Sequence, residues 1–504
     1  MPLVASIDQG TSSSRVILFD SHGAVHAMAQ EEVQQVNLHQ GWSQMSAAMI
    51  SASVDRCIAK VAAANSQPIQ AVGITNQRET TVAWDKSSGL PLCDAVVWND
   101  SRTRDTVAAL IERTPSKSKN HFQHICGLPF STYFSAVKLR WLIDNDLNVQ
   151  QAHDEGRLMF GTVDSWLIYN LTGGPDGGVH VTDVSNASRT MLMNLRTLTW
   201  DAEMIEFFGF EKVNLPTIKS SSEIYGYIKS GPFAGVPISG CIGDQQGALL
   251  GQRCIHPGDL KNTYGTGCFL LFNTGEEIVL PDPECGLLTT LAYQFGPSAS
   301  PIYALEGSIA VAGSAVRWLR DNLGIIKEAK DINDLATTVK DTGGVYFVPA
   351  FNGLFAPHWR DDARGCIVGL TQYTNKAHIC RATLESVCWQ TKEIVDMMNK
   401  SASTPIRRLK VDGGLTASDL CMQLQADILD IPVLRPSMAE TTAFGAAIVA
   451  GLGAGVWSQD SVFGEEALNS QGKVAVFENS IDREARNKRF AEWKIAVQKS
   501  FGSL

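Results

Sequence analysis

The chain opens with two short β-rich runs on either side of a polar segment that contains glycine. Residues 3–7 read Leu-Val-Ala-Ser-Ile and residues 15–19 read Arg-Val-Ile-Leu-Phe, and residues 8–14 between them read Asp-Gln-Gly-Thr-Ser-Ser-Ser. This pattern predicts a β-hairpin with a glycine- and hydroxyl-rich tip. A similar pattern recurs at residues 264–272, Tyr-Gly-Thr-Gly followed by Cys-Phe-Leu-Leu-Phe, and residues 409–414 read as a strand that runs into two glycines. The recurrence predicts a duplicated chain.

Helical apolar periods alternate with strand-like runs in both halves of the chain. The first half carries a helical period over residues 45–64 and a strand over 69–75, followed by a hairpin over 80–98. The second half carries a strand over 302–305 and a helix over 313–319. Such alternation is typical of the α/β class.

The length of 504 residues is enough for two or three domains. Residues 254–258, Cys-Ile-His-Pro-Gly, interrupt a helical stretch that begins near Gln245. We therefore expect an N-terminal lobe over residues 1–252 and a C-terminal lobe over residues 258–504. A cleft between two such lobes is a usual place for a ligand.

Charge and cysteine usage exclude several function classes. The net charge of −10 disfavours nucleic acid and anionic lipid as partners. Eleven cysteines without a Cys-x-x-Cys pair predict neither a disulfide framework nor a zinc site. The N-terminus does not read as a signal peptide, and the longest uncharged stretch, residues 443–457, is too short for a membrane span. We expect a cytoplasmic protein, with a peroxisome-like organelle left open because the C-terminal Gly-Ser-Leu is a poor import signal.

The tip of the first hairpin offers groups that bind phosphate. Thr11, Ser12 and Ser13 supply hydroxyls and backbone N–H groups, and Arg15 adds a positive charge. Asp8 is placed to hold Mg²⁺ through water. A plain serine-rich hairpin is the alternative for one such tip, but two tips and a double glycine suit a nucleotide held between lobes. The chain has no Gly-x4-Gly-Lys-Ser/Thr sequence, which excludes a P-loop.

Five further residues each have a functional and a structural interpretation. Arg78 and Glu79 follow a buried strand, where they are either a surface ion pair or a donor and an acceptor for a substrate. Asp244 stands near a helix N-terminus, as an N-cap or as a general base. Trp98 and Tyr133 are aromatic residues with polar neighbours, and most such aromatic residues belong to the core.

Together these motifs resemble the FGGY sugar-kinase family and, within it, the glycerol kinases. The resemblance rests on residues 8–15, 76–81, 243–246, 262–269 and 411–414 and runs nearly end to end. It implies an α/β, duplicated, two-lobed actin-like ATPase (ribonuclease H-like) fold with an active-site cleft between the lobes. It also implies phosphorylation of glycerol to sn-glycerol 3-phosphate with ATP and Mg²⁺, in a homodimer.

The resemblance also assigns site residues by motif. Glycerol would be bound by Arg78, Glu79, Trp98, Tyr133, Asp244, Gln245 and Phe269, with Asp244 as the general base. ATP or ADP would be bound by Thr11, Ser12, Ser13, Arg15, Thr266, Gly313, Arg317, Gly414 and Ser418, and the metal by Asp8. Arg317 and Ser418 depart from the bacterial pattern, which has glutamine and asparagine there. Residues 227–236 are shorter than the loop with which bacterial relatives bind fructose 1,6-bisphosphate, which predicts no inhibition by that sugar.

Two alternatives remain open at this stage. Another sugar kinase of the same fold, acting on a pentulose or hexulose, would use the same nucleotide loops with a different acceptor site. A non-catalytic nucleotide switch, like actin or the chaperone ATPases, would share the fold and the hairpins. Arg78, Glu79 and Trp98 favour glycerol over other sugars, and Asp244 with Gln245 favours an enzyme over a switch.

Overall fold

Strand β1 (Leu3–Gln9) is the centre of a six-stranded sheet in the first half of the chain. It pairs antiparallel with β2 and parallel with β5, and the sheet has the order β11-β12-β5-β1-β2-β3. The computed structural model describes residues 2–351, 353–358, 360, 362–465, 467 and 473–502. The other strands of this sheet are β2 (Ser13–Phe19), β3 (Val25–Glu32), β5 (Ile69–Asn76), β11 (Gly226–Tyr227) and β12 (Pro237–Gly243).

The second half of the chain builds a sheet of seven strands around β13 (Leu260–Tyr264). Its order is β15-β16-β14-β13-β19-β20-β21. Read from β21 and without β15, this order repeats that of the first sheet strand for strand, with β13 in the place of β1 and the same parallel and antiparallel pairings around it. The predicted duplication is therefore confirmed. The other strands are β14 (Cys268–Gly275), β15 (Leu288–Tyr293), β16 (Ile302–Ile309), β19 (Leu409–Asp412), β20 (Val433–Arg435) and β21 (Ala475–Phe477).

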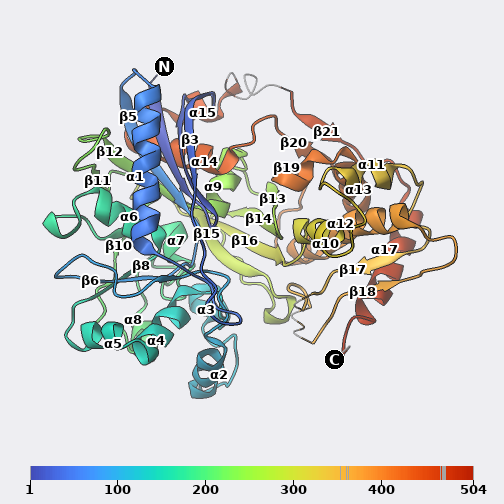
Figure 1. Ribbon diagram of the computed structural model, residues 1–504, viewed down its shortest axis with the longest axis horizontal. Coiled ribbons are helices and arrows are strands. Elements are labelled where there is room, and N and C mark those ends of the chain that lie inside the picture. The colour runs from blue at the N-terminus through green and yellow to red at the C-terminus, as the bar shows by residue number, and fades with distance from the viewer. Residues whose placement is uncertain are drawn as a thin grey trace.

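Two helices lie between the sheets, α9 (Asp244–Gly251) and α14 (Thr441–Gly453). They touch closely, because a Cβ at Gly445 would lie only 2.0 Å from the carbonyl oxygen of Gly247. Figure 1 shows α14, which comes late in the chain, beside the strands of the first lobe. The sequence did not predict that a helix from residues 258–504 would pack on the first sheet.

A hydrophobic cluster joins the two lobes. Val4 and Ile17 of the first sheet, Leu271 and Ala304 of the second, and residues of α9 and α14 such as Phe444 share one buried cluster. The lobes are therefore connected by apolar packing as well as by the chain. Within the described ranges, no helix is both long and apolar enough to cross a lipid bilayer.

The remaining elements cover the sheets and fill an insertion after β5. Helix α1 (Ala47–Ala64) packs on β2 and β3, and the predicted hairpin over residues 80–98 is present through the bridges Thr81–Val96 and Trp84–Pro91. The short strands are β4 (Gln44–Met45), β6 (Val82–Asp85), β7 (Ala95–Val96), β8 (Leu158–Gly161), β9 (Val181–Asp183), β10 (Thr217–Lys219), β17 (Tyr346–Val348) and β18 (Cys366–Val368). The first-lobe helices are α2 (Arg104–Arg113), α3 (Gln123–Cys126), α4 (Ser135–Asn145), α5 (Leu147–Asp154), α6 (Val163–Leu171), α7 (Val184–Ala187) and α8 (Ala202–Phe208). The second-lobe helices are α10 (Gly313–Asp321), α11 (Asp331–Thr337), α12 (Lys376–Ser401), α13 (Asp419–Leu429), α15 (Gln459–Phe463) and α17 (Arg483–Gln498).

Candidate active site

Arg78 stands just beyond the end of β5 and is held by an acid of the other lobe. Its side chain is 2% exposed, and its Nη1 and Nη2 donate to Glu306 Oε2 at 2.5 Å and Oε1 at 3.1 Å. Its Nε lies 3.3 Å from Asp244 Oδ1. Two parallel bonds to one carboxylate fix the plane of a guanidinium. The alternative of an Arg78–Glu79 surface ion pair is therefore wrong, because both residues are buried and Arg78 pairs with Glu306 and Asp244.

Glu79 is held by a second buried arginine. Arg189 Nε donates to Glu79 Oε1 at 2.5 Å, and its Nη2 donates to Glu306 Oε1 at 3.1 Å. Burial raises the pKa of Glu306, but the charges of Arg189 and Arg78 outweigh that effect and hold its pKa at about 2. The backbone of Glu79 has a φ of 59°, in the left-handed region that non-glycine residues seldom adopt. Such a conformation is retained where the surroundings fix it, which is common at functional sites.

Asp244 is the first residue of α9, and the N-cap position before it is Gly243. The N-cap interpretation of Asp244 is therefore wrong, although its Oδ1 accepts from the N–H of Gln245 at 2.7 Å. Burial raises the pKa of Asp244 to about 6, and the charge of Arg78 limits the rise. A carboxylate with a pKa near neutral, at a helix N-terminus, is suited to accept a proton at physiological pH.

Lys261 of the second lobe reaches the residue that follows Asp244. Its Nζ donates to Gln245 Oε1 at 2.5 Å and to Thr263 Oγ1 at 3.0 Å. Burial lowers the pKa of Lys261 to about 8, against the opposing effect of Asp412. The Gln245 side chain is therefore oriented by the second lobe.

Three aromatic rings from three separate segments meet beside these charges, and the Arg189 guanidinium carbon lies 5.5 Å from the centroid of the Tyr133 ring. The Trp98 ring centroid lies 5.7 Å from that of Tyr133 and 6.1 Å from that of Phe269, each edge to face. Trp98 Nε1 donates to Thr11 Oγ1 at 2.9 Å, which joins the aromatic group to the tip of the first hairpin. All three rings are partly exposed, although Trp98 and Tyr133 also pack against the buried core of the first lobe.

The first hairpin tip is a tight turn, closed by a bond from Gly10 N to the carbonyl oxygen of Ser13 at 2.9 Å. Thr11, Ser12 and Ser13 are partly or fully exposed there. Arg15 pairs with Asp8 at 2.8 Å and with Glu440 at 2.6 Å. The charged group predicted to reach a phosphate is thus present at the tip, bound to two acids.

The second tip brings together Thr266, Gly313 and Arg317, three of the nine residues predicted to contact the nucleotide. Arg317 Nη2 donates to Thr266 Oγ1 at 3.0 Å, and Gly313 N donates to the carbonyl oxygen of Gly265 at 3.0 Å. The double glycine passes close by, since a Cβ at Gly413 would lie 2.4 Å from the carbonyl oxygen of Tyr264. Ser418 Oγ caps α13 by accepting from Cys421 N at 3.1 Å, and its hydroxyl donates to Asn333 Oδ1 at 2.8 Å.

The two halves of the chain match the two domains of one enzyme family. Residues 3–251 match the N-terminal domain of the FGGY family of carbohydrate kinases, and residues 260–454 match its C-terminal domain. The chain belongs to the FGGY family of carbohydrate kinases. Similarity to named members of this kinase family extends over nearly the whole chain.

A glycerol kinase of Arabidopsis thaliana is 51% identical to the chain, with 99% of this chain and 97% of the relative covered. A probable glycerol kinase of Dictyostelium discoideum is 46% identical, with 99% and 98% covered. The crystal structure of Plasmodium falciparum glycerol kinase with ADP superposes with a TM-score of 0.92 at 38% identity, covering 100% of this chain and 99% of that one. The structure of a ligand-bound xylulose kinase from Lactobacillus acidophilus superposes with a TM-score of 0.87, covering 100% of this chain and 99% of that one. At 21% identity, this likeness shows the fold alone. The predicted two-lobed α/β kinase fold is confirmed.

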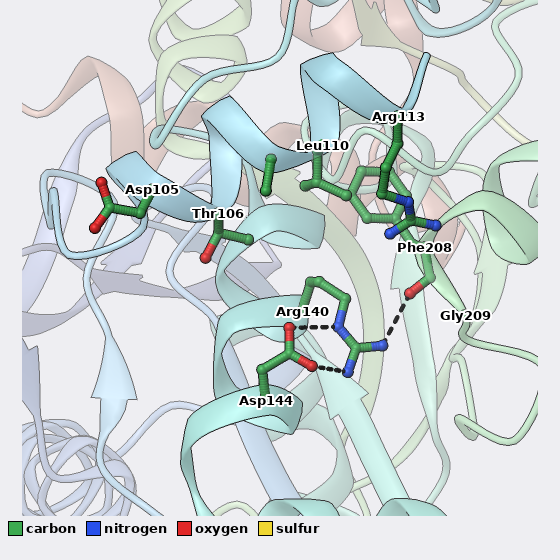
Figure 2. A pocket seen from close by; sticks show the side chains of 9 residues that line it. Asp105, Thr106, Leu110, Arg113, Arg140, Asp144, Phe208 and Gly209 are labelled. Carbon is green, nitrogen blue, oxygen red and sulfur yellow. Dashed lines mark hydrogen bonds and ion pairs between the residues drawn. The ribbon is translucent and has the colours of Figure 1, made fainter. Parts of the chain in front are cut away.

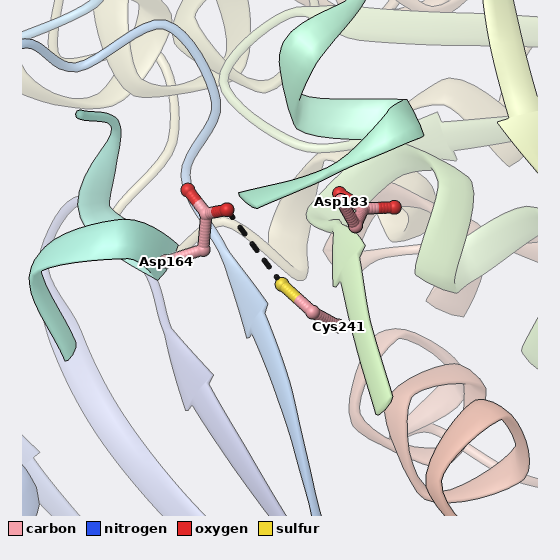
Figure 3. Close-up of side chains that lie close together, drawn as sticks. All are labelled: Asp164, Asp183 and Cys241. Atoms are coloured by element: carbon pink, nitrogen blue, oxygen red, sulfur yellow. Dashed lines mark hydrogen bonds between the residues drawn. The ribbon is translucent and has the colours of Figure 1, made fainter. Parts of the chain in front are cut away.

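Within the part of the kinase that the structure describes, one buried group has the side-chain types and spacing of a metal site. Asp164, Asp183 and Cys241 bring their ligand atoms within 4.8 Å of one another (Figure 3). Their carboxylate oxygens already accept hydrogen bonds from Thr162, Thr182, Ser185, Asn186 and Ser221. We assign no metal to this group, because its acceptors are occupied by donors of the protein.

A pocket of about 490 Å³ opens between α2, α4 and the end of α8 (Figure 2). Its two arginines are already bound. Arg140 donates to Asp144 and to the carbonyl oxygen of Phe208, and Arg113 donates to the carbonyl oxygen of Phe207. None of the predicted site residues lines this pocket, so we place no part of the kinase reaction there.

Sequence reasoning missed the residues that hold the predicted ones in place. Glu306, Arg189, Lys261 and Gln246 are fully buried and bond to Arg78, Glu79 or Gln245 or to one another. A signal was available for Glu306, because a single acid inside the apolar strand β16 requires a buried partner of opposite charge.

Proposed function

We propose that the protein is a glycerol kinase that transfers the γ-phosphoryl group of ATP to glycerol and releases sn-glycerol 3-phosphate and ADP. The observation that carries the proposal is the meeting of Arg78, Glu79 and Asp244 with the rings of Trp98, Tyr133 and Phe269. We call these residues, together with Gln245, the acceptor site. The names of the relatives that match the whole chain support the same conclusion.

The acceptor site fits a small, uncharged polyol. Glycerol has three hydroxyl groups, each of which needs a donor and an acceptor when it is removed from water. Arg78 donates, Glu79 and Asp244 accept, and the aromatic rings supply an apolar surface for the carbon chain. A wrong acceptor would leave some of these buried polar groups unpaired, which is a strong basis for discrimination.

Asp244 is the general base in this proposal. It takes the proton from the attacking hydroxyl as that oxygen forms a bond to the γ-phosphorus and the bond from phosphorus to the β-phosphate oxygen breaks. The neighbouring Arg78 keeps the carboxylate oriented, with Nε 3.3 Å from Oδ1. Because phosphoryl transfer is mostly a matter of positioning and charge neutralisation, the base contributes only part of the rate enhancement.

The two hairpin tips bind the phosphates. Backbone N–H groups and hydroxyls at Thr11, Ser12 and Ser13, with Arg15, are assigned to the transferred phosphate, since tips of this kind form anion-binding concavities. We assign the nucleotide to the opposite lobe, in a nucleotide site made of Thr266, Gly313, Arg317, Gly414 and Ser418. Arg317 supports this assignment despite its departure from the bacterial pattern, because its guanidinium bonds to Thr266 at 3.0 Å.

Asp8 is the residue we assign to Mg²⁺. It is a buried carboxylate at the end of β1, next to the first tip, and oxygen ligands of this type suit Mg²⁺. Arg15 already lies 2.8 Å from Asp8 Oδ2, which favours contact with the ion through water. When bound with ATP, the ion neutralises charge on the phosphates.

The deciding experiment measures ADP release from Mg-ATP by the purified protein. Glycerol is compared with no acceptor, ribulose, xylulose and gluconate. Strong stimulation by glycerol alone is the expected result. Stimulation by a ketose instead would retain the fold and reject the acceptor site, and slow turnover without regard to acceptor would favour a nucleotide switch.

Four further proposals accompany this function. We place the division between the lobes at residues 252–258. We expect the protein to be cytoplasmic. We also expect a homodimer, and light scattering will measure its molar mass. We also expect no inhibition by fructose 1,6-bisphosphate. Residues 228–236 close on themselves through bonds from Ile228 N to the Val236 carbonyl oxygen and from Gly235 N to that of Ile228, which leaves a short turn in place of a binding loop. A hyperbolic fall in activity with millimolar fructose 1,6-bisphosphate would contradict this expectation.

A further inference from the structure

Four residues of the second sheet stand in one row across its strands. Lys410 on β19 is paired in register with Lys261 on β13, Lys261 with Leu271 on β14, and Leu271 with Glu306 on β16. Residues paired in register point to the same face of a sheet. Leu271 belongs to the cluster that joins the two lobes, so this row faces the first lobe and helix α9.

The polar members of the row contact the elements that carry the acceptor site. Lys410 Nζ donates to the carbonyl oxygens of Gln252 and Arg253, just beyond the end of α9, at 2.8 and 3.0 Å. Lys261 binds Gln245 at the start of the same helix. Glu306 binds Arg78, which follows β5. One row of the second lobe therefore touches both ends of the helix that begins with Asp244, and the strand end beside it.

We propose that Glu306 is a positioning residue through which the second lobe orients the acceptor site, a role that rests on the proposed function. Glu306 is fully buried and binds two arginines, each of which touches one acceptor-binding acid. Arg78 contacts Asp244 at 3.3 Å, and Arg189 contacts Glu79 at 2.5 Å. Without the carboxylate between them, two buried guanidinium groups would face each other with like charge.

The positioning role predicts how the ionisation of Asp244, the proton-accepting group, responds to loss of the Glu306 charge. The charged groups around Asp244 are Arg78 and Glu79 after β5 and Lys261 on β13, and the N–H of Gln245 on α9 donates to it. Loss of the charge on Glu306 leaves Arg78 without its principal counter-ion, so Arg78 favours the ionised form of Asp244 more strongly. The acidic limb of the pH profile for kcat/KM then moves to lower pH.

Two substitutions test this role. Glu306→Asp keeps the charge and withdraws it by one methylene, which should raise the KM for glycerol about tenfold and leave the KM for ATP within about twofold. Glu306→Gln removes the charge and should in addition move the acidic limb downward by about half a pH unit or more. Because Glu306→Gln leaves two buried guanidinium groups short of a partner, its circular dichroism is compared with wild type first. Glu306→Asp carries the test if that variant does not fold.

Glu385 supplies a matched control. It is also a buried glutamate of the second lobe, and it also binds two arginines, Arg381 and Arg489. Glu385→Gln should lower the unfolding temperature without changing the KM for glycerol or the pH profile. If Glu385→Gln raises the glycerol KM as much as the Glu306 variants do, the effect is one of general stability and the positioning role is overturned.

The remaining outcomes separate the inference from the proposed function. A wild-type protein that releases ADP on addition of glycerol, together with a folded Glu306→Asp variant of unchanged glycerol KM, overturns the positioning role alone. Equal rises in both KM values overturn it as well. A wild-type protein without glycerol-dependent ADP release overturns the proposed function and, with it, this inference.

Discussion

The acceptor site and the nucleotide site are built in opposite ways. On the acceptor side, Arg78, Glu79, Arg189 and Glu306 are almost completely buried and bind one another across the lobes. On the nucleotide side, Thr266, Arg317 and Gly414 are exposed, and the contacts are single hydrogen bonds near the second tip.

The difference follows from the chemistry of the two substrates. A small neutral polyol brings little binding energy of its own, so its donors and acceptors must be held in place beforehand. A nucleotide brings charged phosphates, which exposed glycine-rich backbone can approach closely. Substitutions in the acceptor site should therefore disturb catalysis strongly, and those in the nucleotide site should mainly weaken nucleotide binding.

The largest effect is expected from Asp244→Asn. An amide cannot accept the proton, so kcat for glycerol should fall about 10²- to 10⁴-fold. Asp105 in the first turn of α2 is the control, because it is an exposed acid at a comparable position in a helix. Asp105→Asn should keep the wild-type kcat. Near-wild-type turnover by Asp244→Asn would show that Asp244 is not the base.

The raised pKa of Asp244, about 6, predicts a pH dependence. The base must be ionised, so kcat/KM for glycerol should fall about tenfold per pH unit below this value.

The same raised pKa predicts an effect on stability. The Asp244 carboxyl holds its proton more tightly in the native state than in the unfolded state, so ionised Asp244 destabilises the fold at pH 7. Asp244→Asn should raise the free energy of unfolding there by about 1–3 kcal/mol, and the gain should vanish below about pH 4. Urea titrations of both proteins at pH 7 and at pH 4 measure this difference in the free energy of unfolding. A gain of the same size at pH 4 would contradict the assignment of the raised pKa to Asp244.

Trp98→Ala should raise the KM for glycerol about tenfold with a smaller change in kcat, because the ring supplies an apolar wall and not a reacting group. Trp98→Phe keeps a ring and loses the bond from Nε1 to Thr11 Oγ1. The KM of Trp98→Phe for glycerol should lie between that of the wild type and that of Trp98→Ala. If Trp98→Ala left the KM for glycerol unchanged, the aromatic wall would not belong to the acceptor site.

Two neighbouring glycines test the nucleotide site. A Cβ at Gly414 would meet no protein atom within 4 Å, whereas one at Gly413, with φ of 92°, would strike the carbonyl oxygen of Tyr264. Gly414→Ala should raise the KM for ATP about threefold without a change in unfolding temperature. Gly413→Ala should lower the stability by about 1–3 kcal/mol. An unchanged KM for ATP in a stable Gly414→Ala variant would remove Gly414 from the nucleotide site.

The parts of the fold that the sequence predicts are those coded locally. Both hairpins, α1 and α10 appear where the local sequence pattern indicates, because each is formed by residues close in sequence. The position of α14 on the first sheet depends on contacts with strands hundreds of residues away, and no local pattern specifies it. The same distinction holds for the site. Arg78 and Asp244 are found from strand and helix ends, whereas Arg189 and its partner Glu306 are 117 positions apart.

The smallest effect is expected at an arginine that contrasts with those of the acceptor site. Arg253 is 4% exposed, and none of its three guanidinium nitrogens has a hydrogen-bond partner among the described residues. Burial lowers its pKa to about 10. Its guanidinium carbon lies 5.7 Å from the centroid of the Phe444 ring. Arg253→Met should therefore raise the free energy of unfolding by about 1–2 kcal/mol, since a buried charge without a hydrogen-bond partner is replaced by an apolar side chain of similar length. Arg408→Met, at a half-exposed arginine paired with Asp259, should change it by less than about 0.5 kcal/mol. Kinetic constants should stay at wild-type values in both variants. Destabilisation by Arg253→Met would show that this arginine, like Arg78 and Arg189, is retained for a partner.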